Sequence, residues 1–221
     1  MTRYIVRPMQ YEDIEAVGEV ERECFTTPWP ASAYRRELRD NRMGRYIVLV
    51  EVADDDPSAR SGQQRDASAE SAGGVRRAVG HFLRPFGRQG SIATARERIV
   101  GFAGMWLMLD EAHVTTIGVK RELRGMGLGE LLFSTLLQIA MDLGARRATL
   151  EVRVSNYSAQ ALYRKYGFHE EGIRRRYYSD NNEDALIMWS DVLTSPEFQT
   201  RYRAARARLE ERLGDLIDIR L

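Results

Sequence analysis

Hydrophobic residues recur with two different spacings along the chain, and together they predict a mixed α/β fold. Short apolar runs rich in β-branched residues and bounded by Gly, Pro or polar residues are typical of strands. We expect strands at residues 4–7, 46–52, 99–108, 113–119, 148–154, 168–178 and 185–189. Apolar residues three and four positions apart predict helices at residues 13–25, 31–41, 131–143 and 158–166, with a further helix that begins near residue 195. The last two strands would form a hairpin around residues 180–182.

Capping residues support several of these helix ends. Gly144 and Gly167 follow two of the helices, where a left-handed residue commonly ends a helix. Ser195 and Pro196 have the order expected of an N-cap and a first helical position. Seven apolar residues of the last helix are predicted to share one face: Phe198, Tyr202, Ala205, Leu209, Leu213, Leu216 and Ile217. We expect this face to pack on the rest of the domain or on a second copy of the chain.

One segment breaks the pattern and divides the chain. Residues 54–74 consist mainly of Asp, Ser, Ala, Gly, Gln and Arg, a composition that predicts disorder. Because strand signals lie on both sides, we interpret residues 53–97 as a disordered insertion within a hairpin. We therefore expect one domain at residues 1–190, interrupted by that insertion, and a C-terminal helical extension at residues 191–221.

Composition and charge exclude several classes of protein. The 221 residues include 33 basic and 32 acidic side chains, so the net charge of +1 gives no general attraction to nucleic acid or to anionic membranes. No run of about 18 apolar residues predicts a membrane-spanning helix, and the first residues have no apolar signal core. A single cysteine, Cys24, excludes an internal disulfide and a Cys-rich metal site. We expect a cytoplasmic protein that uses no metal and has no membrane or nucleic-acid partner.

A glycine-rich turn is the strongest chemical signal. The run Arg124-Gly125-Met126-Gly127-Leu128-Gly129 follows a predicted strand and precedes a predicted helix. Glycines let a ligand approach the backbone, and the free N–H groups at a helix start favour an anion such as phosphate. Glu130 stands where the dinucleotide motif has its third glycine, and Glu130-Leu131 replaces the Lys-Ser/Thr pair of a P-loop. The turn by itself is compatible with a different phosphate ligand or with no ligand.

Three runs of residues carry a resemblance to a known family. The run from Thr116 to Gly129 resembles motif A of the GNAT superfamily of N-acetyltransferases. The strings Leu150-Glu151-Val152-Arg153-Val154-Ser155-Asn156 and Ala161-Leu162-Tyr163-Arg164-Lys165-Tyr166-Gly167-Phe168 resemble motif B. Together with Pro28-Trp29 and the run from Arg174 to Tyr178, they are similar to the ribosomal protein alanine N-acetyltransferases within that superfamily. The resemblance covers residues 3–52 and 98–190.

The resemblance implies a fold and a co-substrate. The fold would be a central, mostly antiparallel twisted sheet with one splayed strand pair, flanked by helices. Acetyl-CoA would bind with its pyrophosphate on the glycine-rich turn and its pantetheine arm along the preceding strand. The implied CoA-binding residues are Ile117, Gly118, Val119, Arg124, Gly125, Met126, Gly127, Leu128, Gly129, Asn156 and Tyr163. From the pattern alone, Ile117 and Val119 equally suit core packing, and Asn156 equally suits a helix N-cap.

The resemblance also implies catalytic residues for direct acetyl transfer. Glu151 would be the base and Tyr163 the acid that protonates the departing thiolate. The alternatives are a surface carboxylate at 151, paired with Arg153 or another neighbour, and a core aromatic at 163. A terminal amine titrates near ~8 and a lysine near ~10.4, so the neutral lysine costs roughly 3 kcal/mol more near pH 7. His113 and His169 match no catalytic position of the family, and we expect surface or packing roles for them.

Two segments of the resembling family close over the acceptor. Here they correspond to residues 25–30 and 176–182, and the implied acceptor-binding residues are Phe25, Pro28, Trp29, Tyr34, Tyr177 and Tyr178. The two adjacent tyrosines equally suit cross-strand packing. The first hypothesis is an acetyltransferase acting on the N-terminal alanine of a ribosomal protein. A transferase acting on lysine or a small-molecule amine, and a CoA-binding module without catalysis, are the alternatives. We expect a monomer or a homodimer.

Overall fold

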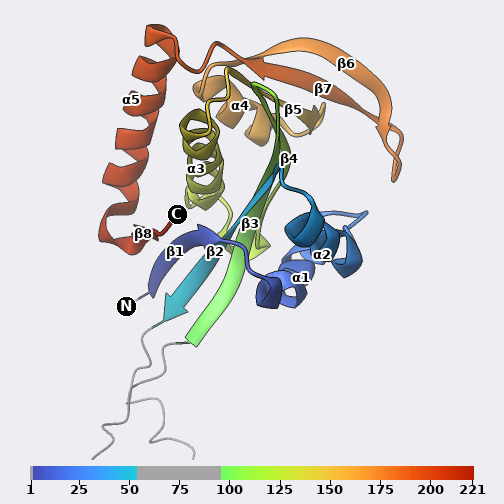
Figure 1. The fold of residues 1–221 in the computed structure, drawn as a ribbon, viewed down its shortest axis with the longest axis vertical. Coiled ribbons are helices and arrows are strands. Elements are labelled where there is room, and N and C mark those ends of the chain that lie inside the picture. Colours follow the sequence, from blue (N-terminus) through green and yellow to red (C-terminus); the bar gives the residue numbers. More distant parts are fainter. Residues whose placement is uncertain (1, 54–95) are drawn as a thin grey trace, which may run out of the picture.

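The computed structural model describes residues 2–53 and 96–221. Within them, eight strands form one sheet in the order β6-β7-β5-β4-β3-β2-β1-β8 (Figure 1). The strands are β1 (Thr2–Pro8), β2 (Gly44–Ala53), β3 (Arg96–Met108), β4 (Glu111–Val119), β5 (Arg147–Arg153), β6 (Phe168–Tyr178), β7 (Glu183–Ser190) and β8 (Ile217–Ile219). Neighbouring strands are antiparallel except for β4 with β5 and β1 with β8, which are parallel. The predicted mixed α/β fold with a mostly antiparallel sheet is confirmed.

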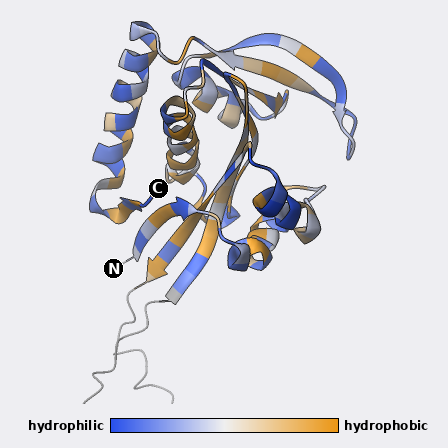
Figure 2. Ribbon diagram, in the orientation of Figure 1, coloured by the Kyte–Doolittle hydropathy of each residue, from blue (hydrophilic) through white to orange (hydrophobic). Residues whose placement is uncertain are grey.

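Five α-helices among these residues cover the sheet. They are α1 (Ile14–Cys24), α2 (Ala31–Asp40), α3 (Leu128–Asp142), α4 (Tyr157–Lys165) and α5 (Pro196–Leu213). Alternation along β2 places Ile47 and Leu49 in the core beneath α3, and Val48 and Val50 in a second core beneath α1 and α2. Because α3 lies between the sheet and α5, it is hydrophobic on most sides, whereas α5 is largely hydrophilic (Figure 2).

The pairing of β4 with β5 ends early, and this positions the candidate site. The two strands are in register only from Glu111–Arg147 to Val114–Leu150. On its other edge, β4 pairs with β3 through a register shift, since Gly104 lies opposite Thr116 and Met105 opposite Val114. A β-bulge of this kind bends the strand that carries it. The C-terminal half of β4 therefore leaves β5, and the two strands splay apart.

The C-terminal extension differs in part from its prediction. α5 begins as expected, with the Ser195 side chain accepting a hydrogen bond from the Phe198 N–H at 3.2 Å. The helix ends at Leu213, before the left-handed Gly214, so Leu216 and Ile217 do not continue its apolar face as predicted. Instead, Ile217 begins β8, which pairs with β1 in parallel. The extension thus adds an edge strand as well as a helix.

The predicted insertion lies almost entirely outside the described residues. β2 ends at Ala53 and β3 begins at Arg96, and these two residues are paired in antiparallel register. The two strands on either side of the insertion therefore form a hairpin, as expected, while the prediction of disorder concerns residues that the structure does not describe. No helix of the described residues is long and apolar enough to cross a membrane.

Candidate active site

The glycine-rich turn joins the free end of β4 to the start of α3. Gly125 and Gly127 have φ angles of 80° and 92°, in the region that favours glycine, and Gly127 is the N-cap of α3. The Arg124 Nε–H donates to the Val119 carbonyl at 3.2 Å, which ties the turn to the end of β4. The N–H groups of the first turn of α3 are consequently presented beside a cation, which is the arrangement that a phosphate group requires.

The C-terminal part of β4, which leads into this turn, has no β5 partner. Ile117, Gly118 and Val119 lie beyond the last β4–β5 pair, so β5 does not cover their backbone on that edge, where the Val119 carbonyl accepts from Arg124 and Cys24. Gly118 has a packing reason as well: a Cβ atom there would lie 2.7 Å from the Phe102 ring. The predicted CoA-binding residues of β4 and of the turn are therefore contiguous in space.

Cys24, at the end of α1, lies against this same strand. Its thiol donates to the Val119 carbonyl at 3.3 Å and is half-buried. Burial raises the pKa of the Cys24 thiol, more than the nearby Arg124 guanidinium lowers it. This environment is the opposite of the one that activates a cysteine nucleophile.

Glu151 lies on β5 just past the point where β4 leaves it. Its side chain is only 7% exposed, and its two oxygens have different partners. Oε2 lies 2.7 Å from His113 Nε2 of β4, and Oε1 lies 3.0 Å from the guanidinium of Arg174 of β6. Arg153, the alternative partner considered from the sequence, instead binds Asp180 and Glu183, each at 2.9 Å.

These partners decide the charge of Glu151. Burial acts to raise the pKa of the Glu151 carboxyl, but the hydrogen bond to His113 and the charges of His113 and Arg174 outweigh it and lower the pKa. The carboxylate is therefore ionised at neutral pH and is held in a hydrogen bond with the imidazole.

His113 is the functional candidate that the sequence analysis missed. A surface or packing role was expected, but the side chain is partly buried, bonds to Glu151 and stands edge-on to Trp106 at 6.4 Å between ring centroids. Its alternation with Val114 along β4 was visible in the sequence. The parallel register that brings β4 beside β5 could not be predicted from the sequence, because it joins segments separated by α3.

Tyr163 projects from α4 with its ring in an aromatic cluster. The ring centroid lies 4.9 Å from Phe133 and 6.2 Å from Phe168. Its hydroxyl makes no hydrogen bond to any residue that the structure describes. Burial, with a smaller contribution from Tyr178, raises the pKa of Tyr163, so the phenol keeps its proton at neutral pH. Asn156 caps the same helix, since its Oδ1 accepts the Ala159 N–H at 3.2 Å.

The two predicted acceptor segments touch each other. The Thr26 hydroxyl, in the loop between α1 and α2, donates to the Asp180 carboxylate at the turn between β6 and β7. Asp180 also accepts from the Arg153 guanidinium, which lies 3.8 Å from the centre of the Tyr178 ring. Thr26, Asp180 and Arg153 thus link the loop and the hairpin to the strand that carries Glu151.

The predicted acceptor-binding residues are not all equivalent. Phe25, Pro28 and Trp29 are partly exposed in the loop, and Tyr177 is 44% exposed on the hairpin with Tyr178 beside it.

Tyr34 differs from its prediction. The ring has no exposed surface, lies beneath Trp29, and its hydroxyl donates to the buried Glu21 carboxylate at 2.5 Å. A ring enclosed in this way offers no surface to a peptide, so direct contact of Tyr34 with the acceptor does not agree with its position.

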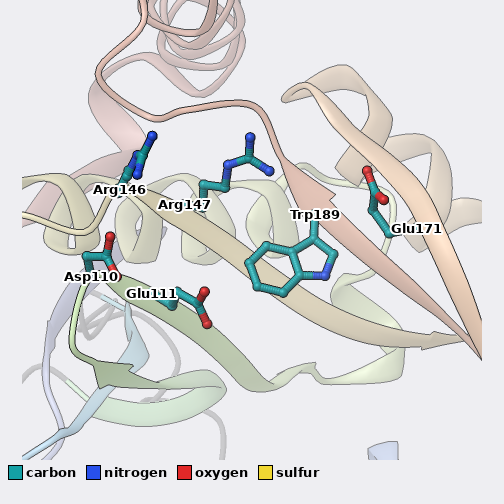
Figure 3. Close-up of a pocket in the computed structure, with 6 residues that line it drawn as sticks. All are labelled: Asp110, Glu111, Arg146, Arg147, Glu171 and Trp189. Atoms are coloured by element: carbon teal, nitrogen blue, oxygen red, sulfur yellow. The ribbon is translucent and has the colours of Figure 1, made fainter.

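A cavity of about 410 Å³ opens near the start of β4 and β5 (Figure 3). It is lined by Asp110, Glu111, Arg146, Arg147, Glu171 and Trp189. Arg147 and Glu151 are four residues apart on β5, so both side chains lie on one face of the sheet. Figure 3 shows charged groups of both signs around the Trp189 ring. Among the described residues, no group of three or more His, Cys, Asp or Glu side chains is arranged to hold a metal ion.

Comparisons with known proteins place the chain among acetyltransferases. A model of the acetyltransferase (GNAT) family matches residues 63–168. A Bacillus subtilis (strain 168) protein named as a candidate ribosomal protein bS18-alanine N-acetyltransferase is 36% identical over 191 residues, which cover 86% of this chain and 97% of that protein. The ribosomal protein bS18-alanine N-acetyltransferase of Salmonella typhimurium is 40% identical over 110 residues, covering 47% of this chain and 74% of the relative.

Solved structures show the same fold. The ribosomal-protein-S18-alanine N-acetyltransferase of Escherichia coli aligns with a TM-score of 0.60 at 24% identity, covering 89% of this chain and 97% of the other. The NatC complex bound to Gag peptide and CoA contains a chain that aligns with a TM-score of 0.58 at 14% identity, with coverage of 86% and 99%.

Proposed function

The chain belongs to the acetyltransferase (GNAT) family, and from this premise we propose that it transfers acetyl from acetyl-CoA directly to the N-terminal amine of a protein. The proposed acceptor is the N-terminal alanine of a ribosomal protein. This finer assignment is supported by the names of the Bacillus and Salmonella relatives and by the segments that flank Glu151.

One observation carries the proposal: β4 and β5 splay apart between the glycine-rich turn and the pair formed by Glu151 and His113. The turn at Gly125–Gly129 begins where β4 has parted from β5, and Glu151 with His113 lies where they separate. The glycine φ angles, the start of α3 and the Arg124 cation fit a diphosphate group. When bound there, acetyl-CoA supplies the thioester that the amine attacks.

Glu151 and His113 would remove the proton from the acceptor amine. Glu151 stays ionised and fixes the imidazole by its hydrogen bond, so the pair can accept a proton directly or through water. The amine nitrogen then forms a bond to the acetyl carbonyl carbon as the carbon–sulfur bond breaks. Tyr163 would give its proton to the departing thiolate, since its raised pKa keeps the phenol protonated until then.

The loop and the hairpin would hold the acceptor's first residues. Phe25, Pro28 and Trp29 form one wall, and Tyr177 and Tyr178 form the other. Their aromatic rings can pack on a small side chain while the tyrosine hydroxyls bind backbone groups. The hydrogen bond from Thr26 to Asp180 holds the two walls together.

The test offers three amines to the purified protein with acetyl-CoA. The first is a peptide with a free N-terminal alanine, the second an N-blocked peptide with one lysine, and the third a polyamine. Mass spectrometry locates the acetyl group. We expect acetylation of the α-amine. Acetylation confined to lysine or to the polyamine would refute the proposal, and CoA binding without turnover on any amine would identify a binding module.

Two histidine variants test whether loss of activity is specific to the proposed site. His113→Asn should lower turnover on the alanine peptide about 100-fold, within the usual range for a group that assists proton transfer. His169 is the matched control, because it also pairs with a glutamate, Glu171, at 2.9 Å, but both side chains are about half exposed. His169→Asn should keep normal turnover. Equal activity of the two variants would remove His113 from the reaction.

A further inference from the structure

The C-terminal extension ends beside the glycine-rich turn. α5 buries one apolar face, formed by Phe198, Tyr202, Ala205, Leu209 and Leu213. It packs on α3, where the Arg206 guanidinium donates to the Ser134 hydroxyl at 2.7 Å. β8 then pairs with β1, and the Arg220 N–H donates to the Val6 carbonyl at 2.8 Å. The extension is held on both sides of its last helical turn, so that turn has a defined position (Figure 1).

Arg212 lies in this last turn of α5 and reaches the start of α3. Its guanidinium donates to Glu130 Oε2 at 3.2 Å. It also covers Gly127, the N-cap of α3, so closely that a Cβ atom at residue 127 would run into it. The Arg212 side chain is 52% exposed, so part of the guanidinium remains accessible beside the turn.

The charges around Glu130 explain what Arg212 adds. Glu130 is in the first turn of α3, and a carboxylate there opposes the approach of another anion. Its partners include two cations, Arg212 and Lys165, the latter with Nζ 2.5 Å from Oε1, and Tyr166 donates its hydroxyl as well. One carboxylate with two cations leaves a surplus positive charge beside the turn. Arg124 adds a further cation at the beginning of the turn.

We propose that Arg212 of the C-terminal extension binds a phosphate group of CoA, so that the extension completes the co-substrate site. This inference rests on the proposed function, which places the CoA phosphates on the turn at residues 124–129. A guanidinium suits the role because its planar N–H groups bind phosphate oxygens while others keep the bond to Glu130. The phosphate is either the diphosphate or the 3′-phosphate, and the two sources can be distinguished.

The test measures the dissociation constants of CoA and of dephospho-CoA by calorimetry. Arg212→Ala should weaken CoA binding about tenfold, typical of one partly exposed charged hydrogen bond, and Arg212→Lys by less. Arg203→Ala is the matched control, because Arg203 is an exposed residue of α5 with no ion-pair partner among the described residues. It removes the same charge and should leave CoA binding unchanged. Thermal melts of each variant confirm that the protein remains folded.

The outcomes are separable. If Arg212→Ala weakens CoA but not dephospho-CoA, the contact is with the 3′-phosphate. If it weakens both ligands equally, the contact is with the diphosphate. Either result supports the inference. Equal CoA affinity in Arg212→Ala and the unaltered protein, or equal losses in Arg212→Ala and Arg203→Ala, would overturn it and leave the proposed function intact. An unaltered protein that binds no CoA would overturn both.

Discussion

Replacing Tyr163 with phenylalanine removes one hydroxyl group from the candidate site and little else. The ring keeps its contacts with Phe133 and Phe168. The hydroxyl has no hydrogen-bond partner in the described part of the chain, so the free energy of unfolding should change by less than about 0.5 kcal/mol. If Tyr163 protonates the departing thiolate, kcat should fall by about 100-fold or more, which corresponds to about 2.7 kcal/mol of activation free energy.

Tyr202→Phe is the matched control for this change. The Tyr202 hydroxyl is buried and donates to the Ser134 carbonyl of α3 at 3.0 Å, and Tyr202 is not one of the candidate-site residues. Its loss should cost about 1 kcal/mol of stability and lower the Tm by about 2–4 °C, with kcat unchanged.

The assay combines steady-state kinetics on the alanine peptide with thermal melts of both variants. A Tyr163→Phe protein with normal kcat would refute the acid role. A Tyr163→Phe protein with low kcat and a Tm reduced as far as that of Tyr202→Phe would refute the reasoning that its hydroxyl has no structural partner.

Three other changes test separate parts of the structure. Burial opposes ionisation of Asp13, but its hydrogen bonds from Arg7 outweigh burial and lower the pKa. This contribution of about 2 kcal/mol is present above the unfolded pKa of about 3.9 and is lost as the pH falls through the lower folded value. Urea unfolding should therefore show Asp13→Asn to be less stable at pH 6, with the difference shrinking toward pH 3. Thr26→Val removes the hydrogen bond to Asp180 and should raise the KM of the acceptor peptide about threefold to tenfold without changing that of acetyl-CoA, because only the acceptor walls are linked by it. Gly127→Ala places a Cβ at a φ of 92°, where it costs about 1–3 kcal/mol, and calorimetry should show CoA affinity reduced at least about tenfold.

The prediction of the fold depended on signals from residues close together in the sequence. Its one clear error concerns a segment whose structure depends on a strand far away in the sequence. Ser195 and Gly144 marked helix ends correctly because a cap is determined by a few adjacent residues. Leu216 and Ile217 were assigned to α5 because their spacing continues its apolar face. Gly214 ends that helix, and the three-residue β8 exists only because β1 offers an edge. A strand of three residues is too short to show the alternation of apolar and polar residues that predicts a strand.

In the candidate site too, features set by the local sequence were predicted and contacts between distant segments were not. The positions of Glu151 on a strand and of Tyr163 on a helix followed from the pattern and from the family resemblance. The pair formed by Glu151 and His113 did not, since it depends on the register of two parallel strands. Burial of Tyr34 was equally hidden, because α2 carries few apolar residues and the tyrosine satisfies its hydroxyl with Glu21, a charged residue expected at the surface.

The parallel pairing of β8 with β1 has a consequence for synthesis of the protein. β1 is made first, but the strand that covers its outer edge lies at residues 217–219. At about 5–20 residues per second, roughly 10–40 s pass before that strand is made. During this interval the β1 edge presents unpaired backbone groups, which is the kind of surface on which nascent chains associate. Chains that stop before residue 217 should therefore be lost to aggregation during production, whether or not they retain every residue of the candidate site.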